Sequence, residues 1–347
     1  MHILIALANR LHLVLHQIDI KGAYLNSVLR EDEVLYMRQP PGYTAPDAGR
    51  RVLCLQKALY GLKQARRRWY QTFTCILSDL GFSQCSVNQA MYYKPNAKVG
   101  ECVVIAVHIN NCTIAIHVDD CTIAASNVKL VEDFKRGLSK NVEVTDLGEL
   151  HWMLGIEVKR DREAGTIHLS QWVYIDTILC HFNFTDLKPL SLPMDVQSRL
   201  MSKQSPNTLT KFMAMRDLLY QEAVGALNWA ALATCPDISF AVSTIARFGT
   251  NPGPAHWEAM KQIFRYLAST CNLWLLYREQ EHALLGYIDT DGSMVEDQRA
   301  VSRYTFPLHL MGDQAGKYPA CLLSNRGHGC QHPYETTTIP EGQAFCH

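Results

Sequence analysis

The sequence predicts an α+β protein built from more than one domain. Its 347 residues are 48% hydrophobic and 19% charged, which is a globular composition with enough chain for two or three cores. Strand-like and helix-like segments mix without the strict alternation of strand and helix that a parallel, doubly wound sheet needs. A β-rich run at 103–125 and three helical patterns after residue 217 show this mixture most clearly.

Apolar periodicity and turn residues predict the other elements in order. The N-terminus is expected to form an amphipathic core helix, because Ile3, Leu4, Leu7, Leu11, Val14 and Leu15 have helical spacing. The further expectations are a strand running into a turn or helix at 17–25, a turn-rich loop at 40–49, a helix at 58–81 that stops at Gly81, a short helix at 131–138, a strand at 150–160, a linker or long connection at 185–217, helices at 218–234, 236–249 and 254–270, and a strand from Leu284 to Asp289.

Composition excludes several classes of protein. Lysine plus arginine equals aspartate plus glutamate at 33 each, which argues against a purely electrostatic nucleic-acid binder. The twelve cysteines form no CxxC pairs, so reduced thiols in an intracellular protein are expected. No secretory signal is recognisable, and no run reaches the roughly 18 apolar residues of a membrane span. His328, Cys330 and His332 lack a second ligand pair at zinc-finger spacing and are not expected to bind zinc.

A tandem near-repeat occupies residues 108–125, where HINNCTIAI is followed directly by HVDDCTIAA. The second copy places Asp119 and Asp120 side by side between apolar, β-branched runs, which predicts a hairpin with two carboxylates at its tip. Carboxylate oxygens are suitable ligands for a divalent metal. The first copy has Asn110 and Asn111 at the matching positions and therefore lacks the charge.

Two strand arrangements of this repeat are open. In one, VVIAVHI pairs with CTIAIHV and places the two asparagines in the site, where neutral amides cannot match carboxylates as Mg²⁺ ligands. In the other, CTIAIHV pairs with CTIAA, the aspartates occupy the tip, and Ile114, Ala115 and His117 replace the residues nine positions earlier. We expect the second arrangement, because charged aspartates tolerate burial worse than asparagines unless metal is present.

A series of motifs runs in one order along most of the chain. These are QIDIKGAYLN, LYMRQPPGY, KALYGLKQA, HVDD, TDLGELHWMLGIEV, LSQWVYI, YQEAVGALNWAAL, CPDISFAV, NPGPAHWEAMK, FRYL and GYIDTDGS. The ordered series resembles the reverse transcriptase of copia-type LTR retrotransposons. One such motif alone would be weak evidence for this resemblance, whereas the whole series in order is specific to it.

The resemblance implies an RNA-directed DNA polymerase that extends a DNA primer by two-metal nucleotidyl transfer. It implies an RNA or DNA template-primer and dNTPs as partners, and two Mg²⁺ ions as cofactor, with Mn²⁺ as a substitute. The implied catalytic and metal-binding residues are Asp19, Asp119 and Asp120. Taken alone, Asp19 would more often be a strand-end or turn carboxylate.

The resemblance also implies residues that bind the nucleotide and the template. Tyr24 stands where the family carries an aromatic steric gate against a 2′-hydroxyl, and a core tyrosine is its alternative. Gly61 would let the nucleotide and the template approach the backbone, with Lys63 and Gln64 lining the same pocket.

Residues 66–70 form a basic, aromatic stretch suited to a nucleic-acid backbone, and Arg67 is assigned to it. Arg66 stands where the family usually has proline. An exposed, solvated helix face is an equal alternative for Arg66 and Arg68, and Trp69 is expected in the core. His117 leads the paired aspartates where the family usually has tyrosine.

The resemblance divides the chain into three domains. Residues 1–184 would form a reverse transcriptase palm with incomplete fingers, and residues 185–280 a mixed, thumb-like connection. Residues 281–347 would form a truncated RNase H-like segment that keeps Asp289 and Asp291. Glu341 is a doubtful third carboxylate there, so this segment is expected to be inactive.

Two functions therefore remain open. One is the RNA-directed DNA polymerase, and the other is a decayed, non-catalytic retrotransposon remnant with at most weak nucleic-acid binding. The shortened fingers, the duplication at 108–125 and the broken tail favour the second, whereas the ordered motifs favour the first.

Overall fold

The computed structural model describes residues 1–43, 51–86, 89–95, 102–107, 120–195 and 198–278, and the backbone of three later strands. The chain divides into two compact units, the first ending at Leu150 and the second beginning at His151. Both units combine helices with antiparallel sheet, so the expected mixture of α and β structure is confirmed.

The first unit is built on a six-stranded sheet with the order β4-β5-β6-β7-β1-β8. Neighbouring strands are antiparallel throughout. The strands are β1 (Val14–Ile20), β4 (Ser83–Gln84), β5 (Met91–Pro95), β6 (Cys102–Val107), β7 (Asp120–Ala125) and β8 (Val144–Glu149), and the helices are α1 (His2–Arg10), the 3₁₀ turn η1 (Ala23–Asn26), α2 (Ala65–Asp79) and α3 (Val128–Leu138).

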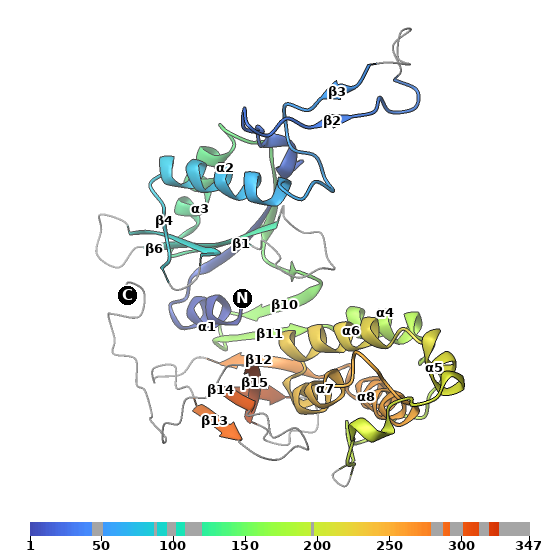
Figure 1. The fold of residues 1–347 in the computed structure, drawn as a ribbon. Helices are drawn as coiled ribbons and strands as arrows, with labels where there is room; N and C mark the ends of the chain where they lie inside the picture. Colours follow the sequence, from blue (N-terminus) through green and yellow to red (C-terminus); the bar gives the residue numbers. More distant parts are fainter. Residues whose placement is uncertain are drawn as a thin grey trace. The chain divides into compact units, whose positions relative to one another are not determined.

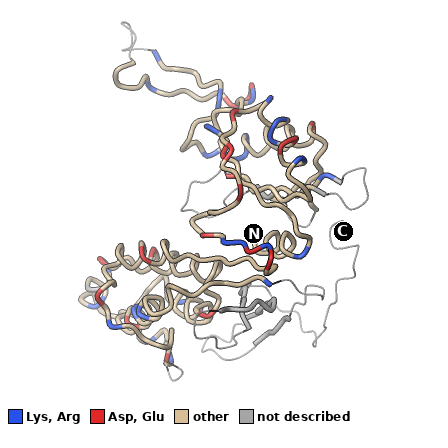
Figure 2. Tube along the Cα trace, turned by 180° about the vertical axis from the view of Figure 1, so that it is seen from behind, with Lys and Arg blue, Asp and Glu red and all other residues tan. Residues whose placement is uncertain are grey.

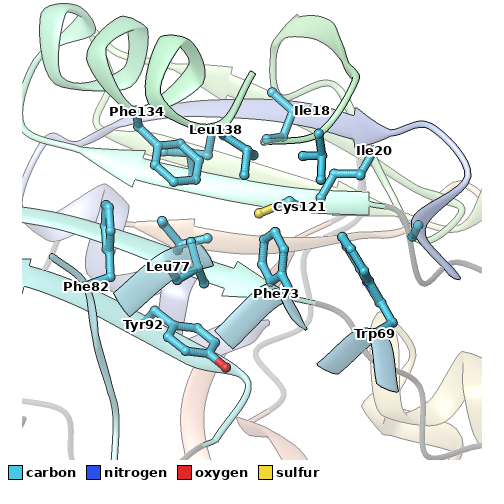
Figure 3. Packing of buried hydrophobic residues seen from close by; sticks show 14 of the residues in the cluster. Ile18, Ile20, Trp69, Phe73, Leu77, Phe82, Tyr92, Cys121, Phe134 and Leu138 are labelled. Carbon is cyan, nitrogen blue, oxygen red and sulfur yellow. The ribbon is translucent and has the colours of Figure 1, made fainter. Parts of the chain in front are cut away.

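Helices α2 and α3 cover one face of this sheet (Figure 1). Because side chains alternate between faces, Ile18 and Ile20 of β1 and Cys121 of β7 point to the same side. Figure 3 shows these residues packed against aromatic and aliphatic side chains of the two helices. This layer is the main hydrophobic core of the unit.

Helix α2 presents its buried side chains at a spacing of four residues. Trp69, Phe73 and Leu77 are at most 1% exposed, and their rings and branches form one stripe. The helix begins at Ala65 rather than at residue 58, because the preceding segment turns at Gly61, where φ is +92°. Trp69 thus lies in the core, as expected.

Helix α1 packs against the other face of the sheet through Leu4, Ile5 and Ala8 (Figure 1). The expected N-terminal helix is shorter than its apolar pattern, and Val14 and Leu15 belong to β1. The helix ends because His12 adopts φ +50° and Leu13 donates a backbone hydrogen bond to Ala8 O at 2.9 Å.

A two-stranded ribbon, β2 (Tyr36–Met37) with β3 (Leu53–Cys54), extends from the first unit (Figure 1). Its base is held by an ion pair between Arg68 Nε of α2 and Glu33 Oε2 at 2.5 Å. The side chain of Arg68 is 9% exposed, so its predicted alternative as part of a solvated helix face is wrong.

The second unit combines a helical core with a sheet in the order β13-β14-β12-β11-β10-β9, with β15 beside β14. Helices α4, α6, α7 and α8 share one buried apolar cluster. The strands are β9 (Trp152–Met153), β10 (Ile156–Asp161), β11 (Thr166–Ser170), β12 (Trp274–Arg278), β13 (Tyr287–Asp291), β14 (Val301–Met311) and β15 (Pro319–Asn325), and the helices are α4 (Trp172–His181), the 3₁₀ turns η3 (Ser202–Gln204) and η4 (Pro236–Ile238), α5 (Leu209–Arg216), α6 (Tyr220–Ala233), α7 (Ser239–Ala246) and α8 (Pro254–Thr270).

The segment expected to be a linker at 185–217 is packed against α8. Arg265 Nε donates to Lys188 O at 2.6 Å, and Ser269 Oγ donates to Leu190 O at 2.8 Å. The same segment contains η3 and α5. It therefore belongs to the fold of the second unit.

His256, at the start of α8, is a buried hydrogen-bonding centre. Its Nδ1 accepts from Gly253 N at 2.8 Å, and its Nε2 lies 3.3 Å from Met201 O. The ring also stacks on Phe248 at 3.9 Å. A Cβ on Gly253 would lie 2.0 Å from Gln204 O, so only glycine allows this close approach.

None of the described helices is both long enough and apolar enough to cross a membrane.

Replacing Phe73 by alanine is expected to lower the free energy of unfolding by about 3–5 kcal/mol, because it leaves a cavity beneath the sheet. Urea denaturation followed by circular dichroism measures this change. Tyr43→Ala is the matched control, since Tyr43 is 84% exposed and its removal should change stability by less than about 0.5 kcal/mol. Equal effects of the two substitutions would contradict the assignment of the core.

The stability of the second unit is expected to fall as the pH drops below 6.5, the ordinary pKa of histidine. Burial lowers the pKa of His256 in the folded state, so the unfolded chain binds a proton that the folded chain rejects. The loss should approach about 1.4 kcal/mol per pH unit until the folded pKa is reached. Thermal melts from pH 8 downward test this, and His256→Gln should flatten the slope.

Candidate catalytic site on the first sheet

Asp19 and Asp120 face each other on the two central strands of the first sheet. Asp19 is the penultimate residue of β1, Asp120 opens β7, and the antiparallel register makes them direct partners. Directly paired residues share a face, with Cβ atoms about 4.5–5.5 Å apart. Both residues are half-buried. The structure thus brings together two of the three predicted catalytic carboxylates.

The face that carries the two aspartates changes in character along the strands. The first cross-strand pair on this face, Leu15 with Ala124, is buried and apolar. The next pair, Gln17 and Thr122, is polar and also buried, at 9% and 1% exposure. The two acids follow at the end of the ladder, so the site lies where an apolar face becomes polar.

Gln17 touches the candidate site directly. Its Nε2 donates a hydrogen bond to Asp120 Oδ1 at 3.4 Å across the strand pair. Gln17 is not among the site residues predicted from the motifs. The signal was present, because a residue two places before Asp19 on a strand must share its face, and a glutamine within an apolar strand needs a partner.

Strand β6 pairs directly with β7, from Val103 opposite Ala125 to Val107 opposite Cys121. Both arrangements predicted for the near-repeat are therefore wrong, because neither pairs Val103–Val107 with Cys121–Ala125. Residues 108–119, which contain the first copy and Asp119, lie outside the described residues. The physical reason is that β6 also pairs with β5 and buries Val103, Val104 and Ile105. Replacing β6 by the inner copy would expose these side chains.

A β-bulge lies on the other side of β1. The register with β8 shifts between Gln17 and Ile18, where β8 inserts one extra residue next to Gly148, whose φ is +77°. The backbone N–H of Gly148 donates to Asp146 Oδ1 at 2.8 Å, and Lys135 Nζ of α3 donates to the same oxygen. The hydrogen bond from Lys135 lowers the pKa of Asp146. These contacts fix the strand next to Asp19.

Tyr24 and the turn around Gly61 lie together beside the end of β1. Tyr24 is 8% exposed in η1, and its ring meets that of Tyr60 edge-on at 4.8 Å. The turn is tied to the segment after Tyr24 by a hydrogen bond from Ala58 N to Ser27 O at 2.9 Å. A Cβ on Gly61 would meet no atom within 4 Å, so the space beside it is open.

The predicted polar residues near this turn are accessible. Lys63 and Arg67 are exposed and Gln64 is half-buried, while Arg66 is exposed on α2. Basic and acidic positions are interspersed along the described trace of the first unit (Figure 2). Attraction of a polyanion would therefore depend on local groups such as the start of α2.

The thiol beside the acids is unreactive. Cys121 follows Asp120 and is 1% exposed beneath the sheet. Burial, and then the negative charge of Asp120, raise the pKa of the Cys121 thiol. It remains protonated and serves as a small core residue.

The two aspartates suit a hard divalent cation, because carboxylate oxygens are the ligands that Mg²⁺ prefers. Their side chains lie on the same sheet face, at positions where two negative charges repel each other unless a cation or proton lies between them. Among the described residues, no group of three or more His, Cys, Asp and Glu could hold a metal. The third predicted ligand, Asp119, lies outside the described residues.

The predicted RNase H remnant falls on strand β13 of the second unit. Asp289 and Asp291 pair through the backbone with Arg303 and Val301 of β14. Their side chains lie outside the described residues, as do Glu341 and the His328–His332 cluster.

Comparison with known proteins decides the family. A family model described as reverse transcriptase (RNA-dependent DNA polymerase) matches residues 1–196. The chain belongs to the reverse transcriptase family. This match places the facing aspartates, the Gly61 turn and strands β9 to β11 within one reverse transcriptase region, across the boundary between the two compact units.

Three of the proteins similar to this chain are transposon proteins. The chain is 34% identical over 304 residues to the retrovirus-related Pol polyprotein from transposon TNT 1-94 of Nicotiana tabacum, covering 87% of this chain and 22% of that protein. It is 34% identical over 278 residues to the polyprotein from transposon RE1 of Arabidopsis thaliana, covering 80% and 18%. A putative transposon Ty5-1 protein of Saccharomyces cerevisiae is 29% identical over 281 residues, covering 80% and 84%.

The expected resemblance to copia-type retrotransposon reverse transcriptases is thereby confirmed. The chain spans about a fifth of the length of the two plant polyproteins it matches, at 22% and 18%. The motifs of this chain have structural roles as well. In the second unit they supply buried hydrogen bonds, such as that from Tyr220 Oη to Ile245 O at 2.8 Å.

Mg²⁺ is expected to raise the thermal midpoint of the wild-type chain, because a ligand that binds only the folded state stabilises it. At a hundred times the dissociation constant the gain is about 2.7 kcal/mol. Asp19→Asn and Asp120→Asn should each remove most of the shift, measured by differential scanning calorimetry with and without Mg²⁺. Asp79→Asn, at an exposed aspartate ending α2, is the matched control. An unchanged shift in Asp19→Asn would exclude a metal at this pair.

Proposed function

We propose that the chain is the polymerase region of an RNA-directed DNA polymerase of a copia-type retrotransposon. The observation that carries the proposal is the direct pairing of Asp19 with Asp120 within a chain of this family. The proposed substrates are a dNTP and a DNA primer on an RNA or DNA template. The proposed catalytic and metal-binding residues are Asp19, Asp119 and Asp120.

In the proposed reaction, the primer 3′-oxygen forms a bond to the α-phosphorus of the dNTP. The bond between the α-phosphorus and the bridging oxygen breaks, pyrophosphate leaves with the electron pair, and the 3′-hydroxyl proton goes to solvent. Two Mg²⁺ ions, when bound, would supply positive charge at the attacking and leaving oxygens. The carboxylates of Asp19 and Asp120, held on paired strands, would orient this charge.

Selection of the nucleotide is proposed for the segment that follows β1. Tyr24 would meet the sugar and exclude a 2′-hydroxyl, while Lys63, Gln64 and Arg67 would contact phosphates and template near Gly61. The packing of Tyr60 on Tyr24 supports this proposal, because it holds the two segments side by side. The open space at Gly61 supports the close approach of a substrate to the backbone.

The proposed layout keeps the three predicted domains. Residues 1–184 would be the palm with partial fingers, residues 185–280 the thumb-like connection, and residues 281–347 the RNase H-like segment. The first compact unit ends at Leu150 and the second begins at His151. The proposed palm at 1–184 would therefore include the first strands of the second unit.

A non-catalytic remnant is the second candidate function, and the near-repeat favours it. Residues 108–120 separate Val107 from its partner Cys121, and this connection contains Asp119. Without residues 108–116, only four residues would remain between the two paired positions, which is an ordinary hairpin loop length. The extra copy therefore lies in the connection that should hold a catalytic residue.

Primer extension on an RNA template with Mg²⁺ tests the proposal. The wild-type chain is expected to extend the primer, and Asp19→Asn and Asp119→Asn should each lower the rate by about two orders of magnitude or more. Asp79→Asn should retain the wild-type rate. Activity that survives Asp119→Asn would exclude the proposed metal ligands.

A deletion of residues 108–116 separates the two candidate functions. If the chain is a remnant inactivated by the duplication, the deletion variant should extend the primer and the wild-type chain should not. If both chains are inactive while folded, the polymerase proposal fails for this protein.

A further inference from the structure

Gln17 and Thr122 are the buried polar residues next to the facing aspartates on their own sheet face, and Gln17 has the longer side chain. Gln17 precedes Asp19 by two positions on β1, and its direct partner across the strands is Thr122. Its side chain is 9% exposed. A buried amide needs a hydrogen-bond partner, because an unpaired one costs about 1–3 kcal/mol.

The partner of Gln17 is one of the aspartates. Its Nε2 donates to Asp120 Oδ1 at 3.4 Å, which crosses diagonally between neighbouring strands. Diagonal neighbours lie about 7–8 Å apart at Cα, within reach of a long side chain. Asp120 is the first residue of β7, and the hydrogen bond from Gln17 fixes its side chain against the neighbouring strand.

The chemistry of the amide suits this task. A glutamine donates a hydrogen bond without adding charge, so the carboxylate of Asp120 keeps its full charge and its remaining lone pairs. A lysine or arginine at the same place would compete with a cation for the carboxylate. A glutamate would add a third negative charge and could not donate when ionised.

We propose that Gln17 is a positioning residue that holds the Asp120 carboxylate toward Asp19 for divalent-cation binding. This inference rests on the proposed function, in which both aspartates are metal ligands. Partners that orient ligating groups in this way typically change metal affinity by about 10–100-fold when removed.

The test is Mn²⁺ binding to the full chain, measured by electron paramagnetic resonance of free Mn²⁺, which needs no polymerase activity. Gln17→Leu and Gln17→Met remove the donor and keep the volume, and each should weaken Mn²⁺ binding about tenfold. Gln56→Leu, at an exposed glutamine of the same unit, should bind as the wild type does. Circular dichroism melts identify any variant that fails to fold, and the other apolar variant then decides.

A second measurement separates positioning from general damage. In primer extension, the rate of Gln17→Leu should recover toward wild type as Mg²⁺ is raised, whereas Asp120→Asn should not recover. Wild-type Mn²⁺ affinity in both folded Gln17 variants would overturn the positioning role alone, provided that Asp19→Asn and Asp120→Asn weaken binding. If the aspartate variants bind Mn²⁺ like the wild type, the proposed metal site fails, and the inference fails with it.

Discussion

The antiparallel register between β1 and β7 is the constraint on which the first unit depends. It sets Ile18 opposite Cys121 and Asp19 opposite Asp120, so one ladder places apolar residues on the face covered by α2 and α3 and the acids on the opposite face. A slip by one residue would turn each side chain of β7 to the opposite face. Asp120 would then point into the core formed by α2 and α3, where an unpaired charge is costly. The core therefore enforces the geometry of the candidate site.

The apolar pattern of the sequence predicts several of the helices and strands, but it does not predict the contacts between distant residues. Helices α6 and α8 and strand β1 follow their apolar periods, because each packs one face on a core. The N-terminal pattern failed at His12, where an αL turn ends the helix although the spacing of apolar residues continues. Arg68 could not be assigned from sequence, because it is buried in an ion pair with Glu33, which lies 35 residues earlier in the chain. Periodicity reports which face is buried, and it does not report which distant residue supplies a partner.

The second unit shows how family motifs can be structural. In NPGPAHWEAMK, Gly253 allows the backbone of Gln204 to approach closely. His256 accepts a hydrogen bond from Gly253 N through Nδ1, and its Nε2 contacts Met201 O. In CPDISFAV, Asp237 is half-buried, desolvation raises its pKa, and its carboxylate accepts a hydrogen bond from Tyr266 Oη at 2.5 Å. Neither motif needs a ligand to explain its residues. Catalytic proposals for this chain therefore concentrate on the first unit.

The near-repeat lengthens the sequence between strands β6 and β7, whose pairing is fixed by the sheet. β6 is held on one side by β5 and on the other by β7, and β7 is held by β1, so neither ladder can accept an extra strand. The duplicated residues must then lie between Val107 and Cys121, which leaves Asp19 and Asp120 paired. Asp119, one residue before the ladder begins, is the predicted ligand that the pairing does not fix. The predicted ligand Asp119 thus stands in the sequence between the duplicated residues and the ladder that pairs Asp19 with Asp120.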